Sequence, residues 1–372
     1  MRVDSLRLRD FRSYHRAEAR LGEGLTVVHG PNGAGKSNLL EALYFGCTGA
    51  SPRTRNDREL VAFGADATRV EVDVVDGDER HELTVAYGPG PDAGRSVKRM
   101  TADGAPLERL LDSPLRPLIS AFFPDRLAVV KGAPSVRRAH LDHFVSACWP
   151  ARSVTVRDYG RILAQRNALL AAIRAGRSSR SSLETWDQEL ARAAVALMAA
   201  RREAADELAG RFAAHADELG LGGSASLDYR PRSRAATSAE FLSELHAHES
   251  EDMRRGFSSH GPHRDDLALK RDGRELRTFG SQGQQRLALL ALLLAERTLL
   301  AERRGTPPVM LLDDVMSELD AERRERLVQG LAGAGQSVIS TTDLDHVPAA
   351  AGHGTTRLLA RDGTLVQEAV AA

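Results

Sequence analysis

Apolar and charged residues alternate at the start of the chain. Within positions 1–14 this alternation is typical of a half-buried strand. Two more alternating segments, 70–75 and 82–87, flank an Asp-Gly-Asp turn and predict a β-hairpin. A short helix is expected around 107–111. A continuous apolar run at 118–123 predicts a buried strand that stops at a proline.

The middle of the chain changes to helical spacing. Apolar residues recur every three or four positions over 183–219, which predicts one long amphipathic helix. An earlier helix is expected at 154–175, joined to it by the polar linker 176–182. The pair predicts an antiparallel helical hairpin that is too short for an extended coiled coil. The following segment, 220–238, is expected to be irregular.

Strand patterns return in the last third of the chain. An apolar helix is predicted at 287–300, and a buried strand at 309–312 that runs into two carboxylates. The other expected elements are strands at 267–270 and 275–278 around a turn, a helix at 318–331, a strand at 337–340 and a hairpin at 357–367. This alternation predicts an α/β fold with a mixed, largely parallel central sheet.

Composition restricts the class of protein. The 372 residues suffice for two lobes, and 51 basic against 51 acidic residues give no net charge. Global charge therefore says nothing about nucleic acid. No apolar run reaches the length of a membrane span, and the charged N-terminus has no signal-peptide core. The two cysteines, Cys47 and Cys148, have no metal-ligand spacing, so we expect a cytoplasmic protein with no membrane partner.

The segment from Leu25 to Asn38 carries the clearest chemistry. It combines an apolar strand, a glycine-rich turn and the start of a helix, and it matches the G-x-x-x-x-G-K-[ST] phosphate loop. The predicted nucleotide contacts are Gly30, Pro31, Asn32, Gly33, Ala34, Gly35, Lys36, Ser37 and Asn38. Lys36 provides a positive charge for the phosphates and Ser37 a hydroxyl for Mg²⁺. The sequence therefore predicts binding of a nucleoside triphosphate with Mg²⁺, with Lys36 also assigned to catalysis.

A second motif supplies carboxylates. Asp313 and Asp314 follow four apolar residues, at the position where a parallel strand presents its carboxyl end to a ligand. Asp313 is predicted to hold Mg²⁺ with Ser37. Asp314 is predicted to orient or deprotonate the water that attacks the γ-phosphate.

The stretch Gly280–Gln285 precedes the apolar helix and has the small and amide residues of a phosphate-receiving helix start. A simpler interpretation is a turn capped by Ser281. One nucleotide does not need two such helix starts, so two molecules placed head to tail would complete each other's sites.

Basic residues gather between 126 and 180. This segment holds eleven lysines and arginines against two acidic residues. Its candidate DNA-phosphate contacts are Lys131, Arg137, Arg138, Arg152 and Arg157. An ordinary solvated helical face is the alternative. His260 and His263 with the neighbouring Asp265 and Asp266 are better explained as a polar turn than as a metal site.

Taken in order, the loop, the S-Q-G-Q signature and the Asp-Asp strand resemble the ABC-type ATPase heads of the SMC-like superfamily. Over nearly its whole length the chain resembles the bacterial RecF family of recombination-repair proteins. The segments behind this resemblance are 8–14 (LRDFRSY), 52–59 (PRTRNDRE), 123–127 (FPDRL), 130–138 (VKGAPSVRR), 165–170 (QRNALL), 261–267 (GPHRDDL), 280–286 (GSQGQQR) and 311–320 (LLDDVMSELD). The first and the last two are shared by the superfamily, and the others are particular to the family.

The resemblance implies an ATP-dependent dimer on double-stranded, single-stranded or junction DNA, with roles in repair, replication restart and the SOS response. It implies RecO and RecR as partners in loading RecA at gaps. Ser281, Gln282 and Gly283 are implied to contact the γ-phosphate in trans, and Asp320 to couple the two sites. No glutamine stands at 123–125, no switch histidine is evident at 341–343, and Asp314 replaces a glutamate, which together imply slow hydrolysis.

The expected organisation is an ATPase lobe of residues 1–125 plus 259–372, with a mostly helical lobe, 126–258, inserted. The alternative function is the ATPase subunit of an ABC transporter. The S-Q-G-Q signature and the roughly 245 residues between loop and signature disfavour that alternative.

Overall fold

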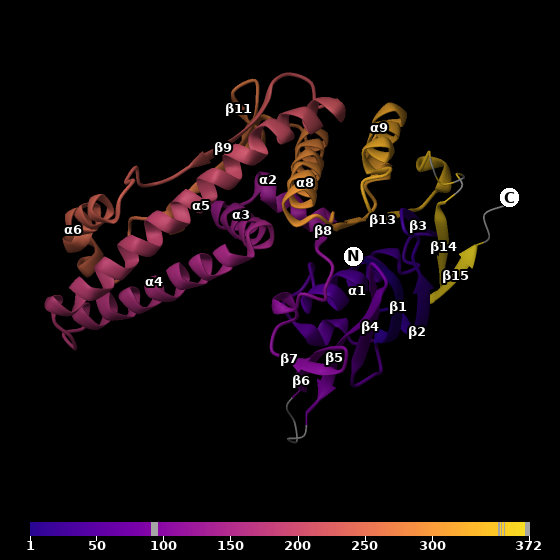
Figure 1. The fold of residues 1–372 in the computed structure, drawn as a ribbon, viewed down its shortest axis with the longest axis horizontal. Helices are drawn as coiled ribbons and strands as arrows, with labels where there is room; N and C mark the ends of the chain where they lie inside the picture. The colour runs from indigo at the N-terminus through magenta and orange to yellow at the C-terminus, as the bar shows by residue number, and fades with distance from the viewer. Residues whose placement is uncertain (91–95, 349, 351, 353, 369–372) are drawn as a thin grey trace. The chain divides into compact units, whose positions relative to one another are not determined.

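The computed structural model describes residues 1–90, 96–348, 350, 352 and 354–368 (Figure 1). It divides into two compact units, residues 1–126 with 300–372, and residues 127–299. The inserted unit was expected to end at residue 258, but it extends to residue 299. Strand β10 (Asp266–Arg271) pairs with β9 (Ala225–Arg230) and so belongs to the inserted unit.

The first unit contains two sheets and two helices. One sheet is antiparallel throughout, in the order β2-β1-β4-β5-β6-β7, and the other has the order β15-β14-β3-β13-β12-β8. The strands are β1 Arg2–Phe11, β2 Tyr14–Arg20, β3 Leu25–His29, β4 Thr68–Asp76, β5 Glu79–Pro89, β6 Ser96–Ala102, β7 Ala105–Leu107, β8 Ile119–Phe122, β12 Val309–Leu312, β13 Ser337–Thr341, β14 Thr356–Arg361 and β15 Thr364–Glu368. The helices are α1 Lys36–Thr48 and α9 Ala321–Leu331.

The second sheet is parallel from β14 to β8, and only β15 runs antiparallel. This confirms the predicted α/β class. Strands β12 and β13 are buried along their whole length, as expected for a sheet covered on both faces. Helix α1 packs against strands of both sheets. The contact is close, because a side chain at Gly46 would come within 2.4 Å of Val72.

The second unit is mostly helical. Its elements are α2 Ala128–Lys131, α3 Pro134–Cys148, α4 Ser153–Arg174, α5 Leu183–Glu218, β9 Ala225–Arg230, α6 Ser238–Arg255, β10 Asp266–Arg271, β11 Arg274–Glu275, α7 Leu276–Phe279 and α8 Gln282–Arg304, whose last residues belong to the first unit. Helices α4 and α5 run side by side and form the predicted hairpin (Figure 1). Helix α6 packs on both of them.

Some local predictions were wrong. Segment 220–238 contains strand β9, whose partner β10 lies far along the chain. The helix expected at 107–111 is strand β7 followed by a single 3₁₀ turn at Leu110–Asp112. The strand expected at 275–278 is two residues long and gives way to α7. No described helix combines the length and apolarity needed to cross a bilayer.

Candidate functional site

The phosphate-loop segment follows β3 and leads into α1. Gly30 and Gly35 both have positive φ, at 146° and 104°. A Cβ on Gly30 would lie 2.2 Å from the Ala360 carbonyl oxygen, and one on Gly35 would lie 2.8 Å from the Tyr14 hydroxyl. Only glycine fits these positions. Gly35 is also the N-cap of α1 and has no side chain to cap the helix, so the first-turn N–H groups are left to an anion.

Lys36 lies against this loop. Its ammonium donates to the carbonyl oxygens of Gly30 at 2.8 Å and Pro31 at 2.9 Å. Burial lowers the Lys36 pKa, while the negative charges of Asp314 and Asp313 act in the opposite direction. The cation is thus held by loop carbonyls and has no directly bonded carboxylate among the described residues.

The structure brings Ser37 and Asp313 together. The Ser37 hydroxyl donates to Asp313 Oδ1 at 2.8 Å across 276 positions of sequence. Ser340 lies on β13, the strand between β3 and β12, and its hydroxyl donates to the same oxygen of Asp313 at 2.7 Å. Burial raises the Asp313 pKa, and the two hydroxyl donors oppose that effect. A serine hydroxyl beside a carboxylate is an oxygen pair suited to Mg²⁺.

Asp314 has a different environment. Its backbone N–H donates to the Ser340 hydroxyl at 2.9 Å, and its φ of 50° is left-handed. Its Oδ1 is buried and has no hydrogen-bond partner among the described residues. Buried polar atoms in proteins are normally satisfied, so an acceptor without a partner at this position is available to a cation or a water molecule. The residues present therefore fit both a polyphosphate and a divalent cation.

A charged network beside the loop was missed by the sequence analysis. The fully buried carboxylate of Glu41 accepts from Arg12 at 2.9 and 3.0 Å and from Arg53 at 3.1 Å. Arg53 also donates to the side chain of Asn38 at 3.0 Å. Its positive charge opposes the rise that burial causes in the Asp313 pKa. The available signal was an acid on the apolar helix behind the loop, with arginines in the segments 8–14 and 52–59.

The signature residues lie in the second unit. Ser281 accepts from the Gln284 N–H at 3.3 Å, and its own N–H donates to the Gln284 side chain at 2.9 Å. Ser281, Gln282 and Gly283 are exposed at the start of α8. The capped turn is therefore present, and the role in a second molecule's site stays a prediction. Asp320 caps α9 by accepting from the Arg323 N–H at 2.9 Å.

The basic segment is partly neutralised. The Arg137 side chain is 2% exposed and donates to Asp266 at 2.6 and 2.9 Å, which leaves it little surface for the phosphate contact expected from the sequence. Arg138 donates to the Asp265 carbonyl at 2.7 Å. Arg152 pairs with Glu203 at 2.7 Å and stacks on a tryptophan ring.

Lys131 and Arg157 are exposed, and their DNA role stays a prediction. The histidines at 260 and 263 contact Glu244 and Tyr159, and the described residues contain no metal-ligand cluster.

Comparisons with known proteins place this geometry in a family. A model described as an AAA domain matches residues 5–98. The protein named DNA replication and repair protein RecF from Moorella thermoacetica is 38% identical over 348 residues, which is 93% of this chain and 91% of that protein. Its namesake from Halothermothrix orenii is 34% identical over 353 residues, 92% of each chain.

Solved structures agree. A structure described as the recombination mediator protein RecF-ATP in the RecFOR pathway matches with a TM-score of 0.86 at 27% identity, covering 99% of this chain and 97% of that one. An SMC head bound to a domain of ScpA matches at a TM-score of 0.59 and 19% identity, over 100% of this chain and 98% of that one, which shows the shared ABC-type ATPase fold. These matches to RecF proteins extend over more than 90% of both chains, which argues against the transporter alternative. This chain belongs to the RecF family of DNA replication and repair proteins.

Proposed function

We propose that this chain is an ATP-dependent DNA-binding protein of recombinational repair, with slow ATP hydrolysis as its release switch. The observation that carries the proposal is the hydrogen bond from Ser37 to Asp313, which joins the phosphate loop to the carboxylate strand at one edge of the parallel sheet. The similarity to a structure described as RecF-ATP supports ATP as the nucleotide.

The loop would bind the phosphates through its N–H groups and the ammonium of Lys36, which exchanges loop carbonyls for phosphate oxygens. The Ser37 hydroxyl and Asp313 carboxylate would hold Mg²⁺. Bound Mg²⁺-ATP supplies a γ-phosphate open to attack by water and a cation that neutralises the developing charge. Asp314, with an unpaired buried oxygen, orients the water and accepts its proton. An aspartate reaches less far than a glutamate, which is consistent with slow turnover.

A second copy of the chain would complete the site. Ser281 is exposed at the N-terminal end of α8, a 23-residue helix whose dipole favours an anion. Two residues before it, the side chain of Phe279 is 67% exposed, so an apolar group beside Ser281 is available for contact with a second molecule. We therefore assign Ser281, Gln282 and Gly283 to the γ-phosphate of the partner subunit, and Asp320 to the coupling of the two sites.

The proposed DNA substrate and protein partners are inferred from the family to which the chain belongs. Its members are named for DNA replication and repair, and one structural relative is described as part of the RecFOR pathway. On that basis the chain acts in the cytoplasm with RecO- and RecR-like partners. Its task is then to promote RecA loading at gapped or junction DNA and to support replication restart.

Sedimentation with and without ATP, on gapped and on blunt duplex, tests the proposal. Wild type should dimerise only with ATP and bind the gapped duplex more tightly. Lys36→Arg should lose ATP-driven dimerisation. Ser281→Arg should lose the dimer while each monomer still binds ATP, whereas Ser243→Arg, on an exposed helix position, should behave as wild type.

Two results would contradict the proposal. Unchanged ATP-dependent DNA binding in Lys36→Arg would remove the phosphate loop from the function. Loss of nucleotide binding by the Ser281→Arg monomer would mean that the signature acts within its own chain.

A further inference from the structure

The antiparallel sheet of the first unit carries a row of arginines. Arg9 on β1 lies opposite Arg16 on β2 and Arg69 on β4. Arg69 lies opposite Ala86 on β5, which lies opposite Arg99 on β6. Directly opposed residues of an antiparallel pair point to the same face. Four arginines therefore share one face along a line that crosses five strands, or about 19 Å at the usual strand spacing.

The row is electrostatically unfavourable in the isolated protein. Like charges placed directly opposite in a sheet are destabilising. Arg69 pairs with Glu71 at 2.6 Å. Arg9, Arg16 and Arg99 are exposed, and none has an ion pair within the described part of the chain.

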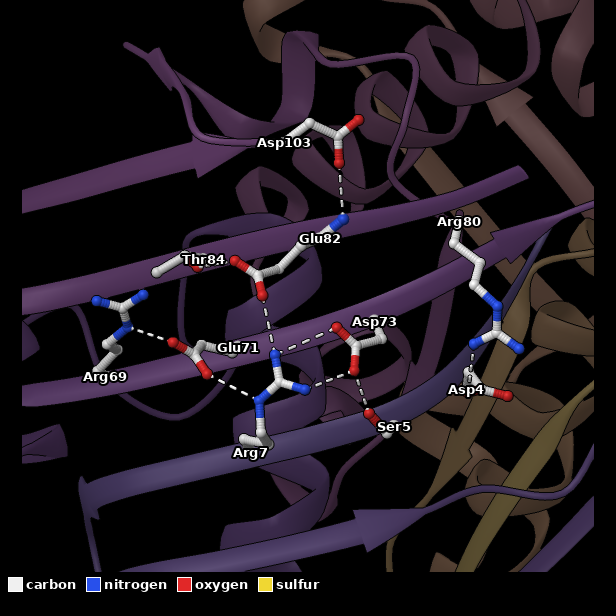
Figure 2. Close-up of polar contacts among 10 residues, drawn as sticks. All are labelled: Asp4, Ser5, Arg7, Arg69, Glu71, Asp73, Arg80, Glu82, Thr84 and Asp103. Atoms are coloured by element: carbon white, nitrogen blue, oxygen red, sulfur yellow. Dashed lines mark hydrogen bonds and ion pairs between the residues drawn. The ribbon is translucent and has the colours of Figure 1, made fainter.

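Arg7, two residues earlier on β1, shows what a neutralised arginine looks like on this face. Figure 2 shows its guanidinium surrounded by three carboxylates. The distances are 2.8 Å to Glu71, 2.7 Å to Asp73 and 2.9 Å to Glu82. The same sheet thus has the means to neutralise an arginine and does not use them at Arg9.

The surface is hollowed at the row. A cavity of about 420 Å³ is lined by Arg9, Arg69 and Arg99, together with uncharged residues that include Ala86 and Tyr87. Two acids also line it. Asp10 is bonded to His15 at 3.0 Å, and Asp66 is exposed. Three guanidinium groups around one hollow can bind a phosphate group through paired N–H donors.

We propose that this row, Arg9, Arg16, Arg69 and Arg99, binds the phosphodiester backbone of DNA, with one phosphate in the hollow. The inference rests on the proposed function and gives it a contact surface outside the basic segment 126–180. Four arginines spaced along one line match the repeating charges of a phosphodiester backbone, which proteins bind chiefly through contacts from arginine and lysine to phosphate.

The test compares two triple variants of the full-length chain. Arg9→Gln/Arg16→Gln/Arg99→Gln removes the three unpaired charges. Arg20→Gln/Arg80→Gln/Arg109→Gln removes three exposed charges from the same unit outside the row. DNA affinity with ATP is measured by fluorescence anisotropy between 50 and 300 mM salt, together with ATP binding and thermal unfolding.

We expect the row variant to bind duplex DNA at least about tenfold more weakly near 100 mM salt. Its slope of log affinity against log salt should fall by about 0.9 for each lost contact, to a total of roughly 3. The control triple should keep most of both. ATP binding should not change, and thermal unfolding should stay the same or rise, because repulsion is relieved.

Three outcomes would overturn the inference. If wild type binds DNA and the row variant binds with the same affinity and slope, the inference alone fails. If the row variant loses binding to polyglutamate and not to DNA, the row serves an acidic protein instead. If wild type itself does not bind DNA with ATP, the proposed function fails together with the inference.

Discussion

Two clusters of buried charge, one at the phosphate loop and one around Arg201 of the inserted unit, are satisfied in different ways. At the phosphate loop, Lys36 is held by carbonyls and Asp313 by hydroxyls, and no ion pair joins them among the described residues. In the inserted unit, Arg201 is bonded to Asp142 at 2.7 and 2.8 Å and to Asp265 at 3.0 Å. The first arrangement has charges without opposite partners, and the second is complete in itself.

The difference separates a binding site from a structural contact. A buried charge that is satisfied only by neutral groups can exchange them for a ligand of opposite charge. A buried arginine with two carboxylates cannot release them without leaving two unpaired charges. The arginines of segment 126–180 look alike in sequence, but Arg166 is bonded to two buried carboxylates, and the buried Arg137 is bonded to one carboxylate from a distant part of the chain.

Removing Arg201 should give the largest effect on stability. Arg201→Met leaves Asp142 and the fully buried Asp265 without their partner, so the free energy of unfolding should fall by about 3 to 5 kcal/mol in urea denaturation. Burial already raises the Asp265 pKa. The stability linked to its protonation is present at low pH and lost as pH rises, so the deficit should shrink on acidification.

Arg192→Met, in an exposed pair with Glu189, is the matched control and should change stability by less than about 1 kcal/mol. If Arg201→Met lost equally little stability, the Arg201 cluster would not be the structural contact that the comparison with the phosphate loop makes it.

Asp313→Asn should affect activity and not stability. The amide oxygen can accept from Ser37 and Ser340 as the carboxylate does, but the charge for Mg²⁺ is gone, so ATP hydrolysis should fall at least about a hundredfold. Because burial raises the Asp313 pKa, its favourable contribution is complete below the ordinary value of 3.8 and is lost as pH rises through the folded value. At pH 7 the variant should therefore unfold no more easily than wild type, and any gain should vanish towards pH 4.

Asp362→Asn, in the exposed turn between β14 and β15, controls for the amide and should leave hydrolysis unchanged. A marked loss of stability in Asp313→Asn at pH 7 would show that this carboxylate is structural, like those around Arg201.

The smallest expected effects are those of substituting Arg137 and Arg157, which should differ in whether stability or DNA binding changes. Arg137→Gln should lower stability by about 1 to 3 kcal/mol and leave the salt dependence of DNA binding unchanged, because its guanidinium is bonded to Asp266. Arg157→Gln should leave stability unchanged and lower the salt slope by about 0.9 if the exposed side chain contacts a phosphate. Chemical denaturation and DNA titrations at several salt concentrations measure both. The opposite pattern would reassign the two residues.

Local patterns predicted most of the first unit. The phosphate loop and the Asp313–Asp314 pair each depend on a short apolar strand followed by particular residues, and the structure places both at one edge of the parallel sheet. Pairings between distant segments could not be foreseen in the same way. Strand β9 lies in a glycine- and proline-containing stretch and is defined only by β10.

Charge counting failed for the same reason. The count of charges over 126–180 leaves out three aspartates from other parts of the chain. Asp187 and Asp252 pair with Arg166, and Asp266 pairs with Arg137. The Glu41 network was missed because the acid and the two arginines that neutralise it lie in three separate segments of the sequence.

The position of β3 has a consequence for how the protein is made. Both neighbours of β3 in the sheet, β13 and β14, come from the last fifth of the chain. The phosphate-loop strand leaves the ribosome about 310 residues before β13, a delay of roughly 15 to 60 s at ordinary rates of synthesis. During that time the backbone N–H and C=O groups along both of its edges have no strand partner in the sheet. The nascent chain should therefore depend on a chaperone until its final segment is released, and the nucleotide site should be the last part of the first unit to form.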